Sequence, residues 1–294
     1  MAANSFAYQF KNSSIVVKLI AINAAIFLVV NLTSFFFSVS PAYLTRWFVL
    51  PNDFGSLLLQ PWSLVTYAFL HFGFWHILFN MLWLYWIGNF ILNLFPAKRF
   101  LTIYLLGAIF GGLLYIIAYN LFPVFAGRTA YLIGASGAVM AIMAFIATYT
   151  PNTQMRIFFF TVKLWHVAVF FFLLDIIRLP TSGNEGGLLA HIGGAIFGYL
   201  YAQQLAKGND IGKWFEDLID GIGNIFKSRS KKPFRKVHRT TRPKTKRSNS
   251  NTTKESKTDN QKKIDIILDK IGKSGYESLT KAEKDFLFKA GKED

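Results

Sequence analysis

The sequence predicts an all-α polytopic membrane protein, a bundle of six transmembrane helices followed by a small helical tail module on the cytoplasmic side. Composition and charge distribution carry this prediction. Of the 294 residues, 52% are hydrophobic and 17% aromatic, and residues 1–206 contain 9 of the 32 Lys/Arg and 3 of the 16 Asp/Glu. Such sparse charge leaves apolar stretches of about 20 residues, the length that a transmembrane helix needs. Residues 1–206 are therefore the predicted six-helix membrane domain.

Six apolar segments are the predicted spans. Residues 38–66 are apolar too, but Pro41, Pro51 and Pro61 interrupt them, so we expect a loop in the membrane interface there. Residues 157–163 are also expected at the interface. No short apolar run with a small-residue cleavage site opens the sequence, so the first segment is expected to be a retained helix. The predicted spans cover residues 15–37, 67–94, 100–122, 132–149, 164–179 and 188–206.

The basic residues of the connecting loops predict the orientation in the membrane. Six spans place both termini on one side, and most of the loop Lys/Arg fall on that side. Because Lys and Arg are enriched in cytoplasmic loops, we expect both termini to be cytoplasmic. The second, fourth and sixth spans then run inward from the outer surface. The basic residues on the cytoplasmic side are Lys11, Lys18, Lys98, Arg99, Arg156, Lys163 and those of the tail.

The tail is predicted to have three parts. Apolar residues at helical spacing make residues 207–226 a juxtamembrane amphipathic helix. Residues 227–260 are a predicted basic disordered linker, since residues 227–247 hold eleven Lys/Arg and no acid. We expect a solvated positive flank here, with contact to anionic lipid as the alternative. No nucleic acid is expected as a partner, because no aromatic residues interleave with the charges. Residues 261–294 are a predicted small helical C-terminal module.

Ser136 lies between glycines in GASG, residues 134–137, at the start of the fourth apolar segment. A serine in a membrane helix most often packs, bonded to its own helix. The alternative is a nucleophile, which requires a base, donors for an oxyanion and access to water. In the predicted orientation, four more polar residues lie at a similar depth, a turn or two below the outer surface. Because polar groups there are costly unless they face a wet cavity, we expect one that gathers His71, His76, Asn80 and His191 around Ser136.

These residues could form a serine–histidine dyad, with Ser136 as the hydroxyl and His191 as the base. The glycines of GASG let the backbone approach closely and leave amides free at a helix start, where the helix dipole favours negative charge. His76 and Asn80 are four residues apart, hence on one helix face, and both can donate hydrogen bonds to an oxyanion. The residues expected to shape the site are Gly134, Gly137, His71, Gly194 and Gly198.

The sixth span carries a Gly-x-x-x-Gly pattern at Gly194 and Gly198. Small residues at this spacing let two helices approach closely, so we expect the sixth span to contact the fourth at Gly137. That contact would place His191 beside Ser136.

Few carboxylates are available to complete a triad. Residues 1–206 contain Asp53, Asp175 and Glu185, and we expect Asp175 deep in the fifth span and the others in loops. The arrangement is therefore predicted to be a dyad with no acid to orient His191. No metal and no cofactor are expected, since no His-Glu-x-x-His pattern or carboxylate partner accompanies the histidines. With no cysteine, thiolate chemistry is excluded.

Three stretches resemble motifs of the rhomboid family of intramembrane serine proteases. HFGFWHILFNM (71–81), GASGAVMA (134–141) and AHIGGAIFGYLYA (190–202) are similar to the family's HxxxxHxxxN, GxSG and AHxxGxxxG motifs in order and spacing. The resemblance covers residues 15–206 and implies a six-helix rhomboid-like bundle. It implies Ser136 as nucleophile and His191 as general base. It also implies an oxyanion hole made by His76, Asn80 and the Ser136 amide.

The resemblance further implies hydrolysis of single-pass or multi-pass membrane proteins near the outer membrane–water boundary. It implies a bacterial inner membrane location, with the lipid bilayer as surroundings and an active site open to the outer side. The glycines of residues 180–187 suit a mobile cap. The chain departs from many bacterial members at Ser63, where they carry arginine. The oligomeric state is not predicted. Two other functions stay open, a non-catalytic binder of membrane helices and a transporter or channel, which the scarcity of carboxylates disfavours.

Overall fold

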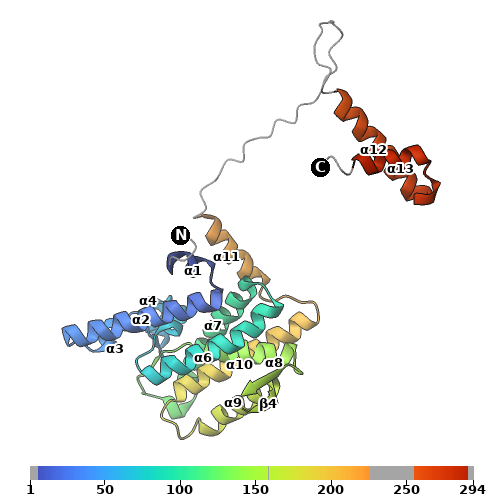
Figure 1. Cartoon of the computed structure of the whole chain (residues 1–294). Helices are drawn as coiled ribbons and strands as arrows, with labels where there is room; N and C mark the ends of the chain where they lie inside the picture. The colour runs from blue at the N-terminus through green and yellow to red at the C-terminus, as the bar shows by residue number, and fades with distance from the viewer. Residues whose placement is uncertain (1–5, 158, 226–254, 291–294) are drawn as a thin grey trace. The chain divides into compact units, whose positions relative to one another are not determined.

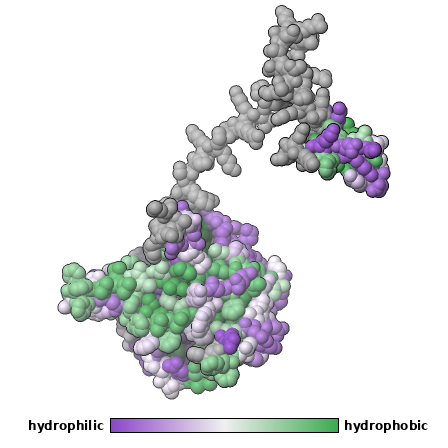
Figure 2. Space-filling model, viewed as in Figure 1, coloured by the Kyte–Doolittle hydropathy of each residue, from purple (hydrophilic) through white to green (hydrophobic). Residues whose placement is uncertain are grey.

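The computed structural model of the chain describes residues 6–157, 159–225 and 255–290. The chain divides into two compact units, Met1–Arg229 and Ser230–Asp294, and each is described by itself. The first unit begins with a short helix, α1 (Phe6–Asn12), and is built mainly from long helices (Figure 1). On its drawn face, hydrophobic residues cover much of the surface (Figure 2), as expected for helices that face lipid.

Six helices occupy the predicted spans. Three of them, α2, α6 and α7, are long and apolar enough to cross a membrane, and α8 is a shorter apolar helix. The predicted all-α bundle is confirmed, whereas the number of membrane crossings stays a prediction. The helices are α2 (Ile15–Phe37), α6 (Phe74–Leu94), α7 (Ala97–Leu121), α8 (Ser136–Tyr149), α9 (Leu164–Arg178) and α10 (Glu185–Ala206).

The second span starts later than predicted. Residues 67–73 were expected in it, but α6 begins at Phe74, with Gly73 as an extended N-cap. The preceding residues form two short turns of helix, α5 (Ser63–Thr66) and η2 (Tyr67–Phe69). Within the stretch expected at the membrane interface, β4 (Phe160–Lys163) pairs antiparallel with β3 (Gln154–Ile157).

The first outer loop contains α3 (Pro41–Thr45), β1 (Leu50–Pro51) and α4 (Phe54–Leu59). Strand β1 pairs antiparallel with β2 (Tyr131–Leu132), which follows η3 (Pro123–Phe125) and leads into GASG. Trp62 Nε1 donates to the Trp47 carbonyl at 2.6 Å, and the Thr66 hydroxyl donates to the Phe48 carbonyl at 2.8 Å. These two side chains thus anchor the loop by binding its own backbone carbonyls. Ser63 is buried there, and its hydroxyl has no partner among the described residues.

The centre of the unit is the contact between α8 and α10. A Cβ built on Gly194 would lie 2.0 Å from the Gly137 carbonyl oxygen, and one on Gly198 would lie 2.1 Å from the Ala141 carbonyl oxygen. The two backbones therefore touch at positions that only glycine can fill. The predicted contact of the sixth span with the fourth is confirmed. We call this contact, with its neighbouring side chains, the α8–α10 seam.

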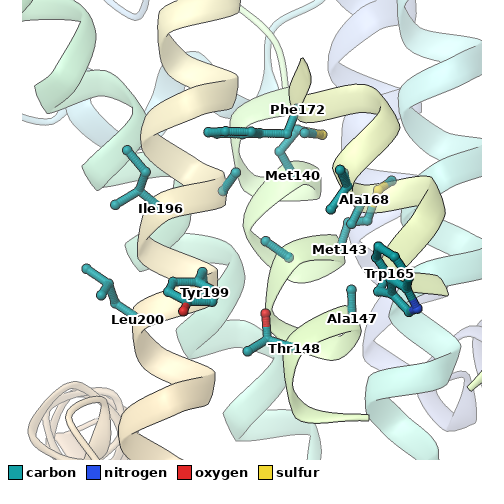
Figure 3. A pocket seen from close by; sticks show the side chains of 13 residues that line it. Met140, Met143, Ala147, Thr148, Trp165, Ala168, Phe172, Ile196, Tyr199 and Leu200 are labelled. Carbon is teal, nitrogen blue, oxygen red and sulfur yellow. The ribbon is translucent and has the colours of Figure 1, made fainter. Parts of the chain in front are cut away.

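Helix α9 is peripheral by comparison. Of its side chains, Leu164, Val167 and Asp175 are buried, while large apolar ones such as Phe170 and Ile177 are 60% and 71% exposed. An apolar groove of about 510 Å³ separates its inner half from the seam. Figure 3 shows the groove's side chains coming from α8, α9 and α10. Small residues form part of its lining, among them Ala144, Ala168 and Ala195.

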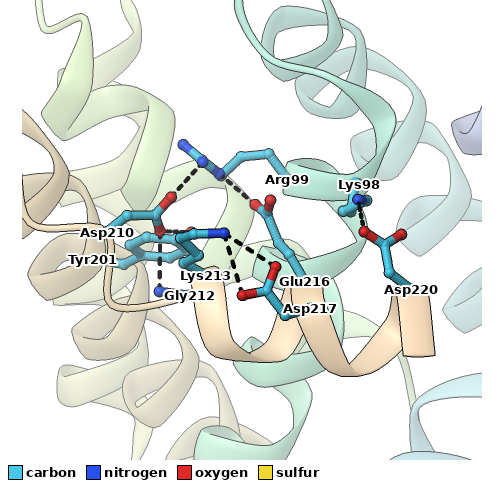
Figure 4. A network of polar contacts seen from close by, with 9 residues as sticks. All are labelled: Lys98, Arg99, Tyr201, Asp210, Gly212, Lys213, Glu216, Asp217 and Asp220. Atoms are coloured by element: carbon cyan, nitrogen blue, oxygen red, sulfur yellow. Dashed lines mark hydrogen bonds and ion pairs between the residues drawn. The ribbon is translucent and has the colours of Figure 1, made fainter. Parts of the chain in front are cut away.

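A polar network ties the start of α7 and the end of α10 to α11 (Lys213–Ile225), the helix predicted within residues 207–226 (Figure 4). Arg99 Nε donates to Glu216 at 2.7 Å, and its guanidinium also binds Asp210. Asp210 in turn accepts from the Tyr201 hydroxyl at 2.8 Å. Lys98 pairs with Asp220 at the more exposed end of the network.

The second unit is a helical hairpin of α12 (Glu255–Ser274), η4 (Tyr276–Ser278) and α13 (Lys281–Ala290), as predicted for the C-terminal module. Helix α12 starts before residue 261, so the last residues of the predicted linker 227–260 are helical, and the boundary was wrong. The rest of that linker lies outside the described residues, and with it the alternative of a contact with anionic lipid. Glu283 ties the hairpin together, because its carboxylate binds both Lys270 Nζ at 2.9 Å and the Thr280 amide at 2.7 Å.

Candidate active site

Ser136 is the first residue of α8, and the turn before it is held from two sides. The Gly134 amide donates to the Tyr67 carbonyl at 2.9 Å, and the Ala135 amide donates to His71 Nε2 at 3.3 Å. Gly134 has φ +116°, and a Cβ on it would lie 2.7 Å from His76 Nε2 and 3.8 Å from Ser136 Oγ. Only glycine fits this conformation and this space. The turn therefore fixes where the serine hydroxyl lies.

The amides of Ser136 and Gly137 are free to bind an anion. In the described part of the chain, the first amide of this helix with a backbone acceptor is that of Val139, which donates to the Ala135 carbonyl at 3.0 Å. Free amides at a helix N-terminus point outward along the axis and carry the positive end of the helix dipole. The Ser136 amide thus lies next to its own hydroxyl as a donor for negative charge.

The predicted polar residues of three helices meet in one cavity of about 620 Å³. Ser136 begins α8, His191 lies near the start of α10, and His76 and Asn80 lie near the start of α6; all four line the cavity. Four of the five residues expected at this cavity thus line it, and the fifth, His71, does not. No hydrogen bond joins Ser136 to His191 within the described ranges, although both line the cavity. Aromatic side chains complete much of the wall: Trp75, Phe79, Trp83, Tyr131 and Phe171.

His76 and Asn80 present donors to this cavity. Asn80 Nδ2 donates one hydrogen to the His76 carbonyl at 2.8 Å, which orients the amide and leaves its second hydrogen for another acceptor. His71 does not line the cavity; it is 1% exposed and packs edge-on against His76, with 4.9 Å between the ring centroids. His71 therefore supports the site from behind, through the His76 ring and the Ala135 amide.

Asp175 contacts His191, which the sequence analysis did not anticipate. Its Oδ2 lies 3.0 Å from His191 Nδ1, so the expectation that no carboxylate reaches this histidine is wrong. Sequence spacing hid the contact, because the two residues lie on different helices and no periodicity relates them. One signal was available: a lone carboxylate in an apolar span is costly unless it is paired or faces a polar cavity.

The loop between α9 and α10 is shorter than the predicted cap, because α10 already begins at Glu185. Gly183 has φ +66°, and the Asn184 amide donates to the Ser182 hydroxyl at 3.1 Å. Asn184 of this loop and Gly187 of α10 line the cavity, so the end of the loop borders the cavity. In the described ranges, no three His, Asp or Glu side chains gather as metal ligands would.

Two family models match the chain. The Rhomboid domain covers residues 58–208, just over half of the sequence, and a family of unknown function (DUF6576) covers residues 251–290. The second match includes all of α12 and all of α13, so the sequence segment that forms this hairpin recurs in other proteins. The Rhomboid match contains Ser136, His191, His76 and Asn80.

Individual relatives agree with the first match. RHOMBOID-like protein 12, mitochondrial, of Arabidopsis thaliana is 32% identical over 50% of this chain and 47% of its own length. Presenilin-associated rhomboid-like protein, mitochondrial, of Homo sapiens is 29% identical over 51% of this chain and 39% of its own. Rhomboid protease GlpG of Yersinia pestis (strain Pestoides F) is 30% identical over 53% and 52%. The chain thus spans about half or less of the length of these curated relatives. By its matched domain and by the motifs that meet in the outer cavity, the chain belongs to the rhomboid family.

Proposed function

We propose that this protein is an intramembrane serine endopeptidase that cleaves membrane-anchored proteins through a Ser136–His191 dyad. The observation that carries the proposal is the outer cavity, in which the hydroxyl, the imidazole and free helix-start amides lie together. The cavity lies at the ends of apolar helices, so its substrate reaches it from the bilayer.

In this mechanism, Ser136 Oγ attacks the carbonyl carbon of a peptide bond while His191 Nε2 takes the hydroxyl proton. The tetrahedral intermediate collapses, and His191 returns the proton to the leaving amine nitrogen. A water then attacks the acyl-enzyme with His191 again as base, which releases the second product and restores Ser136. Each proton that leaves an oxygen is thus delivered by the same imidazole.

The developing oxyanion would be stabilised by the Ser136 amide, the His76 ring and the remaining hydrogen of Asn80. Removing one such donor typically lowers kcat about 10²- to 10³-fold. Of these donors, the Ser136 amide is the most rigidly placed, because the Tyr67 carbonyl and His71 hold the turn before it. The turn thereby contributes to the proposed chemistry without contacting the substrate.

The substrates are proposed to be single-pass or multi-pass membrane proteins, cut near the outer membrane–water boundary. A peptide must be extended for its carbonyl to reach Ser136, so helices that unwind readily are favoured. The relatives named above include mitochondrial proteins and a bacterial protease, so the proposed location is a bacterial inner membrane or its mitochondrial counterpart. Both termini are proposed to lie on the inner side, following the distribution of Lys and Arg.

The test is active-site labelling together with cleavage of a single-pass model substrate in proteoliposomes. A fluorophosphonate should label the wild type, and neither Ser136→Ala nor His191→Ala should be labelled or cleave. Ser182→Ala removes a different hydroxyl near the cavity opening and is the matched control, which should behave as the wild type. Equal cleavage by wild type and Ser136→Ala would reject the protease and favour non-catalytic capture of membrane helices.

A further inference from the structure

Asp175 is a carboxylate in an otherwise apolar membrane helix, and it is 7% exposed. Placing a charged side chain in the middle of a membrane costs about 2.5–3.5 kcal/mol by insertion scales. Such a residue is normally paired or faces a polar cavity. Asp175 does both, because it lines the outer cavity and its Oδ2 lies 3.0 Å from His191 Nδ1.

The contact determines which nitrogen of His191 can act as the base. In a neutral imidazole one nitrogen carries the hydrogen and the other accepts. A carboxylate at Nδ1 favours the hydrogen on that atom, which leaves Nε2 bare and able to accept the Ser136 proton. When Nε2 takes that proton, the resulting imidazolium has a negative charge beside it. With 21% of the His191 side chain exposed and 9% of that of Asp175, solvent screens the pair only in part.

We propose that Asp175 is the positioning residue of the proposed dyad: it holds His191 in the tautomer that leaves Nε2 free to accept the serine proton. This inference rests on the proposed protease function. Among the described residues, the Asp175 side chain bonds to His191 and not to Ser136, so its proposed action is through His191.

The placement of Asp175 on α9 adds a condition to catalysis. Among the described residues, its contact with His191 is the one side-chain hydrogen bond between α9 and another of the predicted spans. The remainder of α9 is held by a few apolar contacts, and much of its surface is exposed. If α9 shifts away from α10, His191 loses its acceptor. His191 can therefore act as the base only while α9 stays packed against α10.

A purely structural tie between α9 and α10 is the competing explanation, and the choice of variants separates the two. Asp175→Asn keeps the size and removes the charge, and Asp175→Glu keeps the charge. Asp53→Asn and Glu185→Gln are matched controls, since each removes one carboxylate that does not line the cavity: Asp53 precedes α4 and Glu185 begins α10. Asn can also replace Asp53 as the N-cap of α4.

Activity is measured as kcat and KM for the model substrate and as the rate of fluorophosphonate labelling. We expect Asp175→Asn to lower kcat and the labelling rate about 100-fold at unchanged KM, within the range that a general base contributes. Asp175→Glu should recover at least part of this loss, and the two controls should stay within about twofold of wild type. A kcat for Asp175→Asn within threefold of wild type, or a loss that matches its unfolded fraction, would overturn the inference.

The tautomer can also be read without catalysis. The chain has five histidines, so an ¹⁵N-histidine spectrum in the Ser136→Ala background can be assigned by single substitutions. The proton should be on Nδ1 of His191 when Asp175 is present and should redistribute to Nε2 in Asp175→Asn. An unchanged spectrum would reject the positioning role. If instead the wild type neither labels nor cleaves while the spectrum changes as expected, the proposed function fails and the assignment of Asp175 to His191 stands.

Discussion

Helix α10 meets α8 through its backbone, whereas α9 meets the same helices through a few side chains. In the α8–α10 seam, glycines bring carbonyls to within van der Waals contact of the opposing helix. At α9, the attachment consists of one hydrogen bond, the buried Leu164 and Val167, and half-buried side chains such as Phe171, which packs edge-on against Trp83. Ser136 and His191 both belong to the seam, and Asp175 belongs to α9. The difference teaches that the two proposed reacting groups lie on the tightly packed interface, whereas the proposed positioning residue lies on the more loosely packed helix.

The strongest test of this comparison is Gly194→Ala. Its new Cβ would lie 2.0 Å from the Gly137 carbonyl oxygen, so the seam must open. We expect the free energy of unfolding to fall by about 3 kcal/mol, the upper part of the range for overpacking, with loss of cleavage. Unfolding by SDS in mixed micelles measures it. Gly221→Ala on α11 is the control, because nothing lies within 4 Å of its Cβ position. A Gly194→Ala protein as stable as this control would refute backbone contact at the seam.

A matched pair of phenylalanines compares the two interfaces directly. Phe145 of α8 is fully buried against Tyr201, while Phe170 of α9 is 60% exposed. Because lipid is as apolar as the core, the cost of Phe145→Ala comes mainly from lost packing, and we expect about 2 kcal/mol. Phe170→Ala should change stability by about 0.5 kcal/mol or less. Unfolding by SDS measures both variants. Equal losses in the free energy of unfolding would show that α9 packs as tightly as the seam.

The inner end of the bundle depends on Arg99, whose side chain is 15% exposed and binds two carboxylates. Arg99→Ala leaves Asp210 and Glu216 without this partner, and we expect a loss of about 1–2 kcal/mol. Lys98→Ala breaks only a more exposed pair and should cost about 0.5 kcal/mol or less. Limited proteolysis after residue 207 would report the release of α11. If both variants are equally resistant to proteolysis, Arg99 is not the main contact that holds α11 to the bundle.

The smallest effect concerns the C-terminal hairpin, whose own helices are held together by side-chain bonds. The Thr280 amide first, then Lys270, lower the pKa of Glu283 from 4.5 to about 2. Because the folded pKa is depressed, the stabilisation is fully present above pH 4.5 and is lost as the pH falls toward 2. Amide exchange of residues 281–290, corrected for intrinsic rates, should lose protection over this window in the wild type. In Glu283→Gln the protection should be weaker and independent of pH there; the same pH response in both would contradict the assignment.

Features of the fold and the site that follow from residue periodicity and local chemistry could be predicted from the sequence. The Gly194/Gly198 spacing predicted the seam, and the orientation of alternate spans predicted that Ser136, His191, His76 and Asn80 meet at one end. The start of α6 was missed because Tyr67 and its neighbours are as apolar as a span, and only tertiary contacts such as the Tyr67–Gly134 hydrogen bond set the turn.

Contacts between distant segments were not predictable in this way. The pairing of β1 with β2 joins residues about eighty positions apart through strands of two residues, too short for a pattern. Asp175 carried a signal in its burial cost, but nothing in its spacing pointed to His191. A carboxylate in a membrane helix therefore implies that a polar partner lies on a neighbouring helix.

The polar network at the start of α7 has a consequence for synthesis. Lys98 and Arg99 precede their partners Asp210, Glu216 and Asp220 by 111 to 122 residues. While α7 is being made, these carboxylates do not yet exist, so both cations are still unpaired at the stage when the predicted orientation of the chain is set. Once residues 210–220 emerge, the same cations hold α11 against the bundle. The same two residues thus carry the predicted orientation signal first and the attachment of α11 afterwards.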